Sequence, residues 1–296
     1  MLLSLLAVAC LSFFIMKAFP GSPFSEDANF HPLVQEQLRS YYKLDQPVLQ
    51  QLAAFLGRLA KGDLGFSLVH PGQKVSEIII QGIPTTVTLG IVAVLISVIS
   101  SFAIVFFCWR RPQWKGFFDF LTVVILSIPT LLAAPMLILI FAIKLDWLPV
   151  ALAKDWTGFI LPTIVLSLRP TVNLARLLTQ SLEKTSQELH VRFTRSLGFS
   201  ENFIFQKNIL RCSLSSFLAY LGPTCAGLLS GSFLVESIFA LPGLGYGYVA
   251  SLVDRDYPVV IGLSLFYCLI LMTSNLLLEF IHCLADSRWQ GRHDKN

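Results

Sequence analysis

The run PTTVTLGIVAVLISVISSFAIVFFCWRR, from Pro84 to Arg111, decides the class of fold. No charged residue stands between Pro84 and Trp109, and two arginines follow at once. About 20 apolar residues are enough to cross the hydrocarbon core of a bilayer as a helix. Arginine at the end of such a run favours the cytoplasmic side of the membrane. The run therefore predicts a transmembrane helix whose C-terminal end lies inside the cell.

The composition of the whole chain is that of a membrane protein. Of its 296 residues, 54% are hydrophobic and 14% are charged, and the mean hydropathy is +0.68. Soluble domains carry about 25% charged residues, so this chain is too poor in charge for a soluble globule. The net charge of +4 is small and gives no reason to expect a nucleic-acid partner.

Five other apolar runs have the length of a transmembrane helix. Together with Pro84–Trp109 they predict an all-α membrane protein with six transmembrane helices. Nothing repeats at a fixed short period, so a solenoid is excluded. The five runs are Leu2–Phe19, Phe117–Ile143, Phe159–Leu178, Ser216–Ala240 and Val259–Leu284.

The distribution of Lys and Arg orients these helices. Basic residues concentrate in the loop 110–116, the segment 183–215 and the tail 286–296, which share one side if every run spans. That side is cytoplasmic by the positive-inside rule, so both termini are predicted inside. The chain then divides into a first helix, an extracytoplasmic segment, a core of five helices and a cytoplasmic tail, at 1–19, 20–83, 84–285 and 286–296.

The first apolar run has a second interpretation, as a cleaved signal peptide. Such a peptide begins with basic residues and ends at a small-residue cleavage site. Here no Lys or Arg precedes Leu2, and MKAFPGSPF, Met16–Phe24, lacks an A-x-A pattern. We therefore expect a retained helix. The missing basic start also leaves room for a natural start upstream of Met1.

The segment 20–83 is too long for a passive connection and predicts two helices. Leu33–Tyr42 is helix-compatible, and in LDQP we expect Asp45 to cap a second helix with Pro47 in its first turn. Apolar residues then recur at helical spacing up to Gly62. This second helix is expected to pack on the outer ends of the transmembrane helices or lie in the interface, and the alternative is a docking surface for an external partner. Its apolar face comprises Val48, Leu49, Leu52, Phe55, Leu56 and Leu59.

The cytoplasmic segment 183–215 carries a pattern of its own. EKTSQELHVRFTRSL, 183–197, is compatible with a helix that Gly198 can end, because glycine adopts the left-handed conformation without penalty. Ser200 can cap a second helix, in whose first turn Glu201 is favourable. Exposed apolar residues on such a helix pair favour a protein partner. A basic loop held by lipid headgroups explains the same residues equally well.

The stretch ALPGLGYGY, Ala240–Tyr248, invites two functional interpretations that its surroundings exclude. A phosphate-binding loop follows a strand, and none precedes this stretch. A potassium filter needs a pore helix, and none fits between the fifth run and Pro242. We expect a tight turn in which Pro242 halts the helix and Gly243 and Gly245 let the chain fold back. This outer-mouth turn is expected to continue through a short interfacial helix, YVASLVDRDYP, that ends at Asp256, Tyr257 and Pro258.

The chain shows no pattern of a catalytic or metal-binding site. Its six Cys include no CxxC pair and its five His show no metal-ligand spacing. No G-x-x-x-x-G-K-[ST] motif occurs, and no nucleophile, base and acid stand at a catalytic spacing. The sequence predicts a protein without enzymatic activity, metal or bound cofactor.

Several motifs, in this order along the chain, resemble those of one protein family. They are PGSPF (20–24), YKLDQP (42–47), KGDLGFS (61–67), FALPGLG (239–245) and DRDYPVVIG (254–262). The chain resembles the permease subunits of the oligopeptide and dipeptide ABC importers, of the type of the first of their two membrane subunits. The resemblance runs nearly from end to end.

The resemblance implies a function and a set of partners. A permease of this type moves peptides inward across a bacterial inner membrane by alternating access. It lies in lipid beside a second, homologous permease subunit and on two cytoplasmic ABC ATPase subunits, which bind ATP and Mg²⁺. An extracytoplasmic binding protein delivers the substrate.

In this family the cytoplasmic loop between the fourth and fifth helices docks on an ATPase subunit. The matching stretch here is RFTRSLGFS, 192–200, so the resemblance favours a protein partner for the segment 183–215. This chain departs from the family at Phe193 and Thr194, which replace smaller residues, and at Leu197, which replaces lysine. The residues expected on the docking surface are Arg192, Phe193, Thr194, Arg195, Gly198, Phe199, Ser200 and Glu201.

Arg169 places a charge within the fourth predicted transmembrane helix, next to Pro170. A charge inside the membrane is costly and indicates a functional residue by default. Contact with a peptide carboxylate in the pathway is the functional interpretation. The structural alternatives are an ion pair with Glu236 in the fifth run or contacts with backbone carbonyls.

Two alternatives to a peptide importer remain open from the sequence. The same type of permease serves for nickel or another small solute, because the binding protein largely selects the substrate. A stand-alone secondary transporter or channel is the alternative of a different class, and it would show inverted repeats with broken helices.

Overall fold

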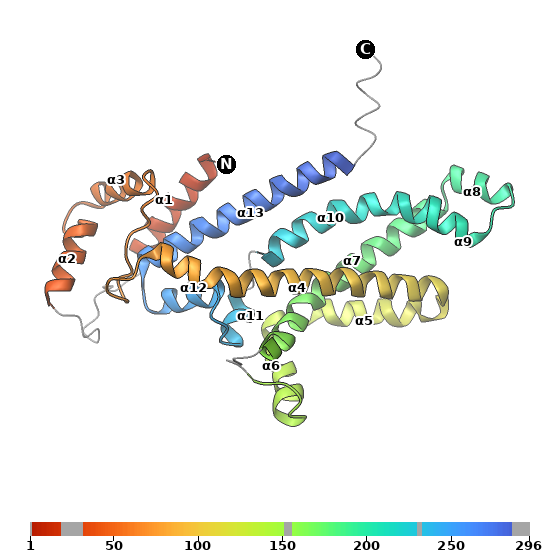
Figure 1. Cartoon of the computed structure of the whole chain (residues 1–296), viewed down its shortest axis with the longest axis horizontal. Coiled ribbons are helices and arrows are strands. Elements are labelled where there is room, and N and C mark those ends of the chain that lie inside the picture. The colour runs from red at the N-terminus through yellow and green to blue at the C-terminus, as the bar shows by residue number, and fades with distance from the viewer. Residues whose placement is uncertain (1, 19–31, 151–155, 230–232, 286–296) are drawn as a thin grey trace, which may run out of the picture. The chain divides into compact units, whose positions relative to one another are not determined.

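The computed structural model describes residues 2–18, 32–150, 156–229 and 233–285, and these form helices and short connections (Figure 1). Within these residues the one departure is an isolated β-bridge between Phe66 and Lys74, so the predicted all-α class is confirmed. The motif at 20–24 and the tail 286–296 lie outside the described residues. The elements are α1 (Leu2–Ala18), α2 (Pro32–Tyr42), α3 (Val48–Leu59), α4 (Val75–Arg110), η1 (Pro112–Trp114), α5 (Lys115–Ser127), α6 (Thr130–Leu137), η2 (Ile138–Lys144), η3 (Trp156–Phe159), α7 (Ile160–Ser186), α8 (Leu189–Ser196), α9 (Glu201–Ile204), η4 (Phe205–Leu210), α10 (Arg211–Leu229), α11 (Phe233–Ile238), α12 (Leu244–Val253) and α13 (Tyr257–Ala285).

Four helical stretches of the described chain are long and apolar enough to cross a membrane. Each coincides with one of the six predicted runs. The first run, α1, is apolar but shorter than these four. The four stretches are Val75–Arg110, Trp156–Ser186, Phe217–Ile238 and Tyr257–Leu277.

The third predicted run, Phe117–Ile143, is not one straight helix. It is bent by 102° between Ser127 and Thr130. Proline lacks the backbone N–H of a helix and pushes the preceding residue out of the helical region. Ile128, which precedes Pro129, is accordingly extended, with φ −81° and ψ 119°. The two halves count as a fifth candidate span only when they are taken together.

Three helices extend beyond their predicted ends. α4 begins at Val75 and contains Pro84, which we expected to open the run. α7 continues past Leu178 to Ser186, and α10 begins at Arg211. The additional turns carry charged residues, and hydropathy does not detect a helix where it leaves the apolar zone.

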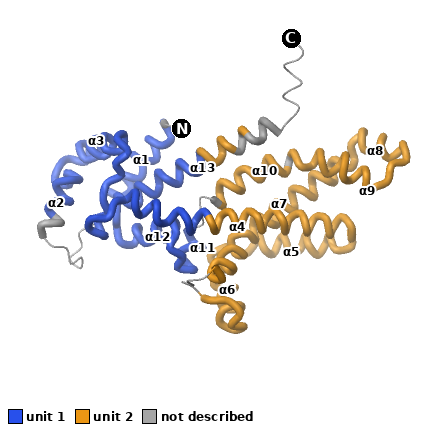
Figure 2. Tube along the Cα trace, viewed as in Figure 1, with its two compact units in different colours: residues 1–87, 231–272 blue, residues 88–230, 273–296 orange. Residues whose placement is uncertain are grey.

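The chain forms two compact units, residues 1–87 with 231–272 and residues 88–230 with 273–296 (Figure 2). Unit 1 contains α1, α2, α3, α11 and α12, and unit 2 contains α5 to α10. Each of the long helices α4 and α13 is divided, with one part in unit 1 and the other part in unit 2. Each unit has its own apolar core.

In unit 1, α3 packs on α1 and α13, as expected for a helix that covers transmembrane helices. Phe55 is buried and stacks on Phe13, with ring centroids 5.9 Å apart, and Ile261 of α13 joins the same cluster. Burying one such large apolar side chain stabilises the fold by about 1.5–3 kcal/mol. The buried face is narrower than predicted, because Val48 and Leu49 are exposed.

The predicted ends of α3 were wrong. Pro47 is itself the N-cap residue, with φ −53° and ψ 145°, and no side chain caps the helix, so Asp45 does not. The helix ends at Leu59 rather than at Gly62. Gly62 instead takes the left-handed conformation in the following turn, with φ 75°.

In unit 2 the core is a buried stripe on α7. Leu174, Leu178 and Leu182 recur at i, i+4 and i+8, which places them on one side of the helix. Ile204 and Ile209, from the helices that follow the loop at Gly198, are fully buried against this stripe. The loop is therefore held to the transmembrane part of the unit through apolar contacts.

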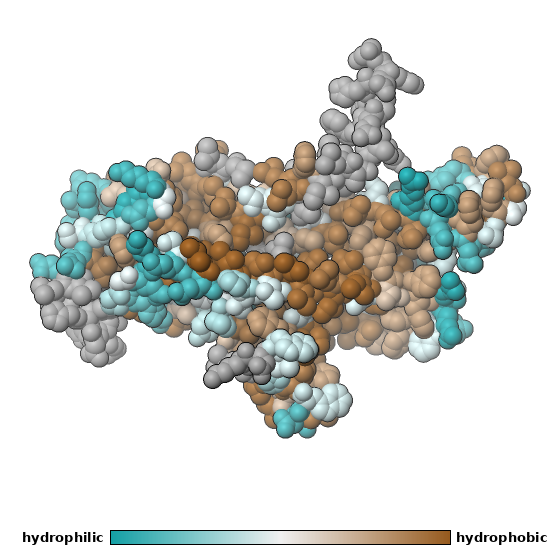
Figure 3. Space-filling view, in the orientation of Figure 1, coloured by the Kyte–Doolittle hydropathy of each residue, from teal (hydrophilic) through white to brown (hydrophobic). Residues whose placement is uncertain are grey.

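The outward side of α4 is apolar, as expected for contact with lipid. Ile91, Leu95 and Ile99 are exposed at a spacing of four residues. Figure 3 shows the apolar surface over α4, and hydrophilic residues over α2 and α3. Apolar side chains exposed along a helix of this length are typical of a membrane span.

Candidate functional site

The loop around Gly198 has the predicted helix–glycine–helix form. Gly198 has φ 81°, the left-handed conformation, directly after α8. The Ser200 side chain caps α9 by accepting a hydrogen bond from the Phe203 N–H, 3.4 Å away. The predicted single helix from Glu183 was wrong, because α7 ends at Ser186 and α8 begins anew at Leu189.

The two helices of this loop bury one side and expose large apolar residues on the other. Val191 and Ile204 are fully buried and fix both helices to unit 2. Phe199 and Phe203 stack on each other, with centroids 4.9 Å apart, yet remain 47% and 42% exposed. An apolar patch of this kind indicates an interaction site. The coupling patch comprises Leu189, Phe193, Leu197, Phe199 and Phe203.

Polar contacts hold the patch in shape. Arg195 donates two hydrogen bonds to the carboxylate of Glu201, at 2.6 Å and 3.0 Å, and so ties the end of α8 to the start of α9. The guanidinium keeps the pKa of Glu201 below its usual value. Asn208 donates to the Thr194 hydroxyl at 2.8 Å. Arg192 is exposed on α8.

The turn after α11 begins directly after Ile238, earlier in the sequence than the turn predicted at Pro242. It comprises the residues between Ile238 and Gly243, with Ala240 in the left-handed conformation at φ 48°. Gly243 is the N-cap of α12, so Gly245 lies inside a helix rather than in the turn. The short helix therefore begins with the glycines instead of following them.

The glycines surround a carboxylate of the protein itself. Glu236 is fully buried, and its Oε2 accepts a hydrogen bond from the Gly245 N–H at 2.8 Å. The Thr86 hydroxyl donates to Oε1 at 3.0 Å and accepts from the Leu244 N–H at 2.9 Å. A carboxylate is favourable at a helix N-terminus, where N–H groups are otherwise unpaired. A Cβ at Gly243 would collide with this carboxylate, which explains the glycine there.

A second buried carboxylate joins the predicted extracytoplasmic segment to the turn before α13. Asp256 is 2% exposed, and its Oδ2 accepts a hydrogen bond from the Ser67 hydroxyl. The Leu68 N–H donates to Oδ1 at 3.0 Å. Burial raises the pKa of Asp256, and these hydrogen bonds oppose the rise. The motifs KGDLGFS and DRDYPVVIG thus meet in space.

This junction allows a test by a double-mutant cycle on the variants Ser67→Ala, Asp256→Asn and both together. We expect a coupling free energy of about 1–3 kcal/mol, because either change leaves a buried polar partner without its hydrogen bond. Thermal unfolding of the purified chain in detergent measures it. The neighbouring Asp254 is exposed, so Asp254→Asn should leave stability unchanged. Additive single effects would show that the two side chains do not act together.

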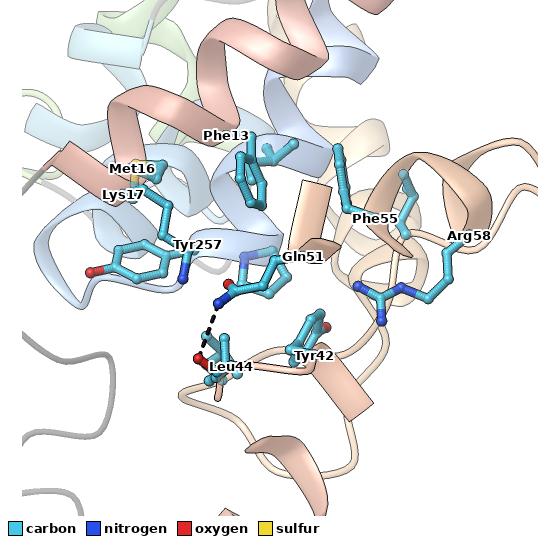
Figure 4. A pocket seen from close by; sticks show the side chains of 13 residues that line it. Phe13, Met16, Lys17, Tyr42, Leu44, Gln51, Phe55, Arg58 and Tyr257 are labelled. Carbon is cyan, nitrogen blue, oxygen red and sulfur yellow. Dashed lines mark hydrogen bonds between the residues drawn. The ribbon is translucent and has the colours of Figure 1, made fainter. Parts of the chain in front are cut away.

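Tyr257 and Pro258 border a small cavity of unit 1 (Figure 4). Its volume is about 50 Å³, room for a few waters and not for a peptide. Beside it, Gln51 donates hydrogen bonds to the carbonyls of Leu44 and Gln46, at 3.0 Å and 2.8 Å. The cavity is a packing space under α3 and not a substrate site.

Arg169 contacts a backbone carbonyl, which is one of the two structural roles expected from the sequence. Its Nη2 donates to the Leu126 carbonyl at 2.9 Å, at the end of α5. The Glu236 carboxylate accepts hydrogen bonds from Thr86 and Gly245, both within unit 1. Arg169 itself remains exposed on α7.

Sequence reasoning missed the partners of both buried carboxylates. Thr86 lies 150 positions from Glu236, and Ser67 lies 189 positions from Asp256. Only the acidic residues stood out, because a charge near an apolar run is conspicuous and a hydroxyl is not. The polar residues within the motifs, such as Ser67 in KGDLGFS, were the features of the sequence that could have indicated these partners.

Comparison with known proteins matches this chain over most of its length. Residues 93–291 match the family model described as "Binding-protein-dependent transport system inner membrane component". The chain is 35% identical over 293 residues to the dipeptide transport system permease protein DppB of Bacillus subtilis (strain 168), covering 96% of this chain and 93% of that protein. It is 29% identical over 292 residues to the oligopeptide transport system permease protein OppB of Escherichia coli (strain K12), with coverages of 96% and 94%.

A solved structure supports the fold at lower similarity. The crystal structure of an amino acid ABC transporter with histidines aligns with a TM-score of 0.57 at 19% identity, over 70% of this chain and 94% of that chain. The apolar helices and the family match define a multi-pass protein of the bacterial inner membrane. The chain belongs to the family of inner-membrane components of binding-protein-dependent transport systems, and the relatives named above are transport system permease proteins.

Proposed function

We propose that the chain is a permease subunit of an ATP-driven importer of dipeptides or oligopeptides. The near-complete alignment with dipeptide and oligopeptide permeases supports this substrate class. The protein itself binds no nucleotide and carries no catalytic residue. Its contribution is the translocation pathway and the coupling of this pathway to ATP hydrolysis by its partners.

The coupling patch is the observation that carries the proposal. Phe199 and Phe203 form a stacked aromatic pair that is held open to solvent beside the left-handed Gly198. A cytoplasmic ATPase subunit buries this patch in the assembled importer. Because Val191 and Ile204 connect the patch to the apolar core of unit 2, closure of the ATPase subunits moves the transmembrane helices.

The proposed topology has six membrane crossings with both termini in the cytoplasm. α1 is the first, and the bent pair of α5 with α6 and η2 is the third. The basic residues around α8 and α9 then lie inside, as the positive-inside rule requires. α2, α3 and the junction at Asp256 lie outside, where an extracytoplasmic binding protein delivers the substrate.

The proposed assembly comprises this chain, a second homologous permease subunit and two ATPase subunits. The test is purification of the tagged chain from its native membranes in mild detergent and identification of what accompanies it. Two ATPase subunits and one similar permease are expected. Recovery of the chain alone, while a control importer stays intact, would favour a stand-alone transporter. A nickel-binding partner protein would change the substrate class.

A single substitution tests the coupling patch directly. Phe199→Ala is expected to reduce the ATPase subunits recovered with the chain about tenfold or more, because central aromatic residues dominate interface energies. Val253→Ala is the control, since Val253 is 76% exposed, belongs to unit 1 and is not part of the coupling patch. Equal recovery from the two variants would contradict the docking role.

A further inference from the structure

A polar stripe runs along the exposed side of α7, within a helix that crosses the membrane. Arg169, Asn173, Arg176, Gln180 and Glu183 recur at alternating steps of four and three residues, which places them on one face. From Arg169 to Glu183 this face is about 21 Å long, at 1.5 Å per residue. Arg169, Asn173 and Arg176 lie within the predicted membrane run Phe159–Leu178, whereas Gln180 and Glu183 lie on the cytoplasmic extension of α7. Charged side chains inside the membrane face a water-filled cavity or a polar partner and not lipid.

α5 lies along this stripe and carries a matching one. Lys115, Asp119 and Thr122 are spaced by four and three residues on the side towards α7. The Lys115 ammonium bonds the Glu183 carboxylate at one end, and Arg169 bonds the Leu126 carbonyl at the other. The two helices are thus joined at both ends of their polar faces.

Between these ends lies a cavity of about 360 Å³, which Ile104 and Cys108 of α4 also line. Its volume is within the usual range of small-molecule sites, roughly 300–1,000 Å³. Arg176 and Gln180 of α7 and Asp119 of α5 line it. Among the described residues, Arg176 has neither an ion pair nor a hydrogen bond, so its five N–H donors are available to a ligand.

The other side of α5 is apolar. Phe117 and Phe120 are 53% and 67% exposed, and neither lines the cavity. Lipid or a neighbouring subunit can cover that side at little cost in free energy, because no charged group is taken out of water there. A subunit seated on the polar groove would instead bury Arg176 and Asp119, which is expensive without matching charges.

We propose that the groove between α5 and α7 is a water-filled section of the transport pathway that takes zwitterionic peptides. Arg176 binds the peptide carboxylate, and Asp119, close to Lys115 and Glu183, receives the ammonium group. Opposite charges on facing walls suit a ligand that carries one charge of each sign. This inference rests on the proposed function, because it assigns a location to the same substrate.

Accessibility of single cysteines tests the groove in the complete importer. The natural cysteines are first replaced by serine, and Gln180→Cys or Phe120→Cys is then introduced. A charged, membrane-impermeant methanethiosulfonate reagent is added to inside-out vesicles. Gln180→Cys should react readily, and dialanine should slow that reaction, whereas Phe120→Cys should not react. Equal reaction of both variants, no effect of dialanine, or cross-linking of Gln180→Cys to the second permease would overturn the proposal.

Uptake of labelled dialanine by cells with the complete importer tests the charge. Arg176→Gln should lower uptake about tenfold, because a hydrogen bond to a charged group is lost. Arg176→Lys should retain much of the uptake. Lys184→Gln serves as the matched control, because Lys184 is exposed on the same helix and does not line the cavity. Unchanged uptake by Arg176→Gln would contradict the role of the charge. Absence of uptake by the unaltered importer would count against the peptide function, while cysteine labelling would still decide whether water fills the groove.

Discussion

Peptide uptake is expected to fall to background when Gly198 is replaced by proline, although the chain still reaches the membrane. Gly198 has φ 81°, and its N–H donates to the Arg195 carbonyl at 3.1 Å. Proline fixes φ near −65° and has no N–H, so it cannot occupy this turn. The angle between α8 and α9 must then change, and the coupling patch no longer presents Phe199 and Phe203 together. When uptake and ATP hydrolysis are measured in parallel in proteoliposomes, ATP hydrolysis should no longer drive uptake.

Two milder substitutions at the same position separate coupling from a general folding defect. Gly198→Ala retains the N–H but places a Cβ in the left-handed conformation, at a cost of about 1–2 kcal/mol. Gly198→Asn costs less, because asparagine visits this conformation more readily. No atom lies within 4 Å of the added Cβ, so the backbone conformation alone sets the order. Uptake should fall from asparagine to alanine to proline, and normal uptake by the proline variant would rule out the coupling role.

The elements that the sequence predicted well are those encoded locally. The apolar runs gave the core of every long helix, because a span needs only length and the absence of charge. Ser200 and Gly198 gave the loop between α8 and α9, because caps and left-handed glycines act within a few residues. The bend at Pro129 also has a local cause, which an even hydropathy profile concealed.

The contacts that sequence reasoning missed join distant parts of the chain. Glu236 was visible as a buried acid, but nothing near it in the sequence indicates Thr86. The groove was missed for a related reason. Arg169 was noticed because it lies in the middle of a run, while Asp119 and Arg176 lie towards the ends of their runs. Their common location follows only from the packing of α5 against α7.

Two glycines of the same stretch are expected to respond in opposite directions to replacement by alanine. At Gly243 a Cβ would collide with the Glu236 carboxylate and approach the Thr86 hydroxyl to 2.8 Å. Forcing an extra carbon into such a site costs about 1–3 kcal/mol. At Gly247, inside α12, no atom lies within 4 Å of the added Cβ. There alanine gains up to about 1 kcal/mol in helix propensity.

Thermal unfolding of the two purified variants in detergent distinguishes these cases. Gly243→Ala should lower the melting temperature and Gly247→Ala should leave it equal or raise it. The pair differs by four positions on one helix, so lipid, detergent and expression conditions affect both alike. If both variants unfolded like the unaltered protein, the close approach of Glu236 to the N-terminus of α12 would be refuted. Gly243 and Gly245 leave room for the buried Glu236 carboxylate, whereas Gly247 has no atom within 4 Å of an added Cβ. The expected difference in melting temperature follows from this difference in surroundings.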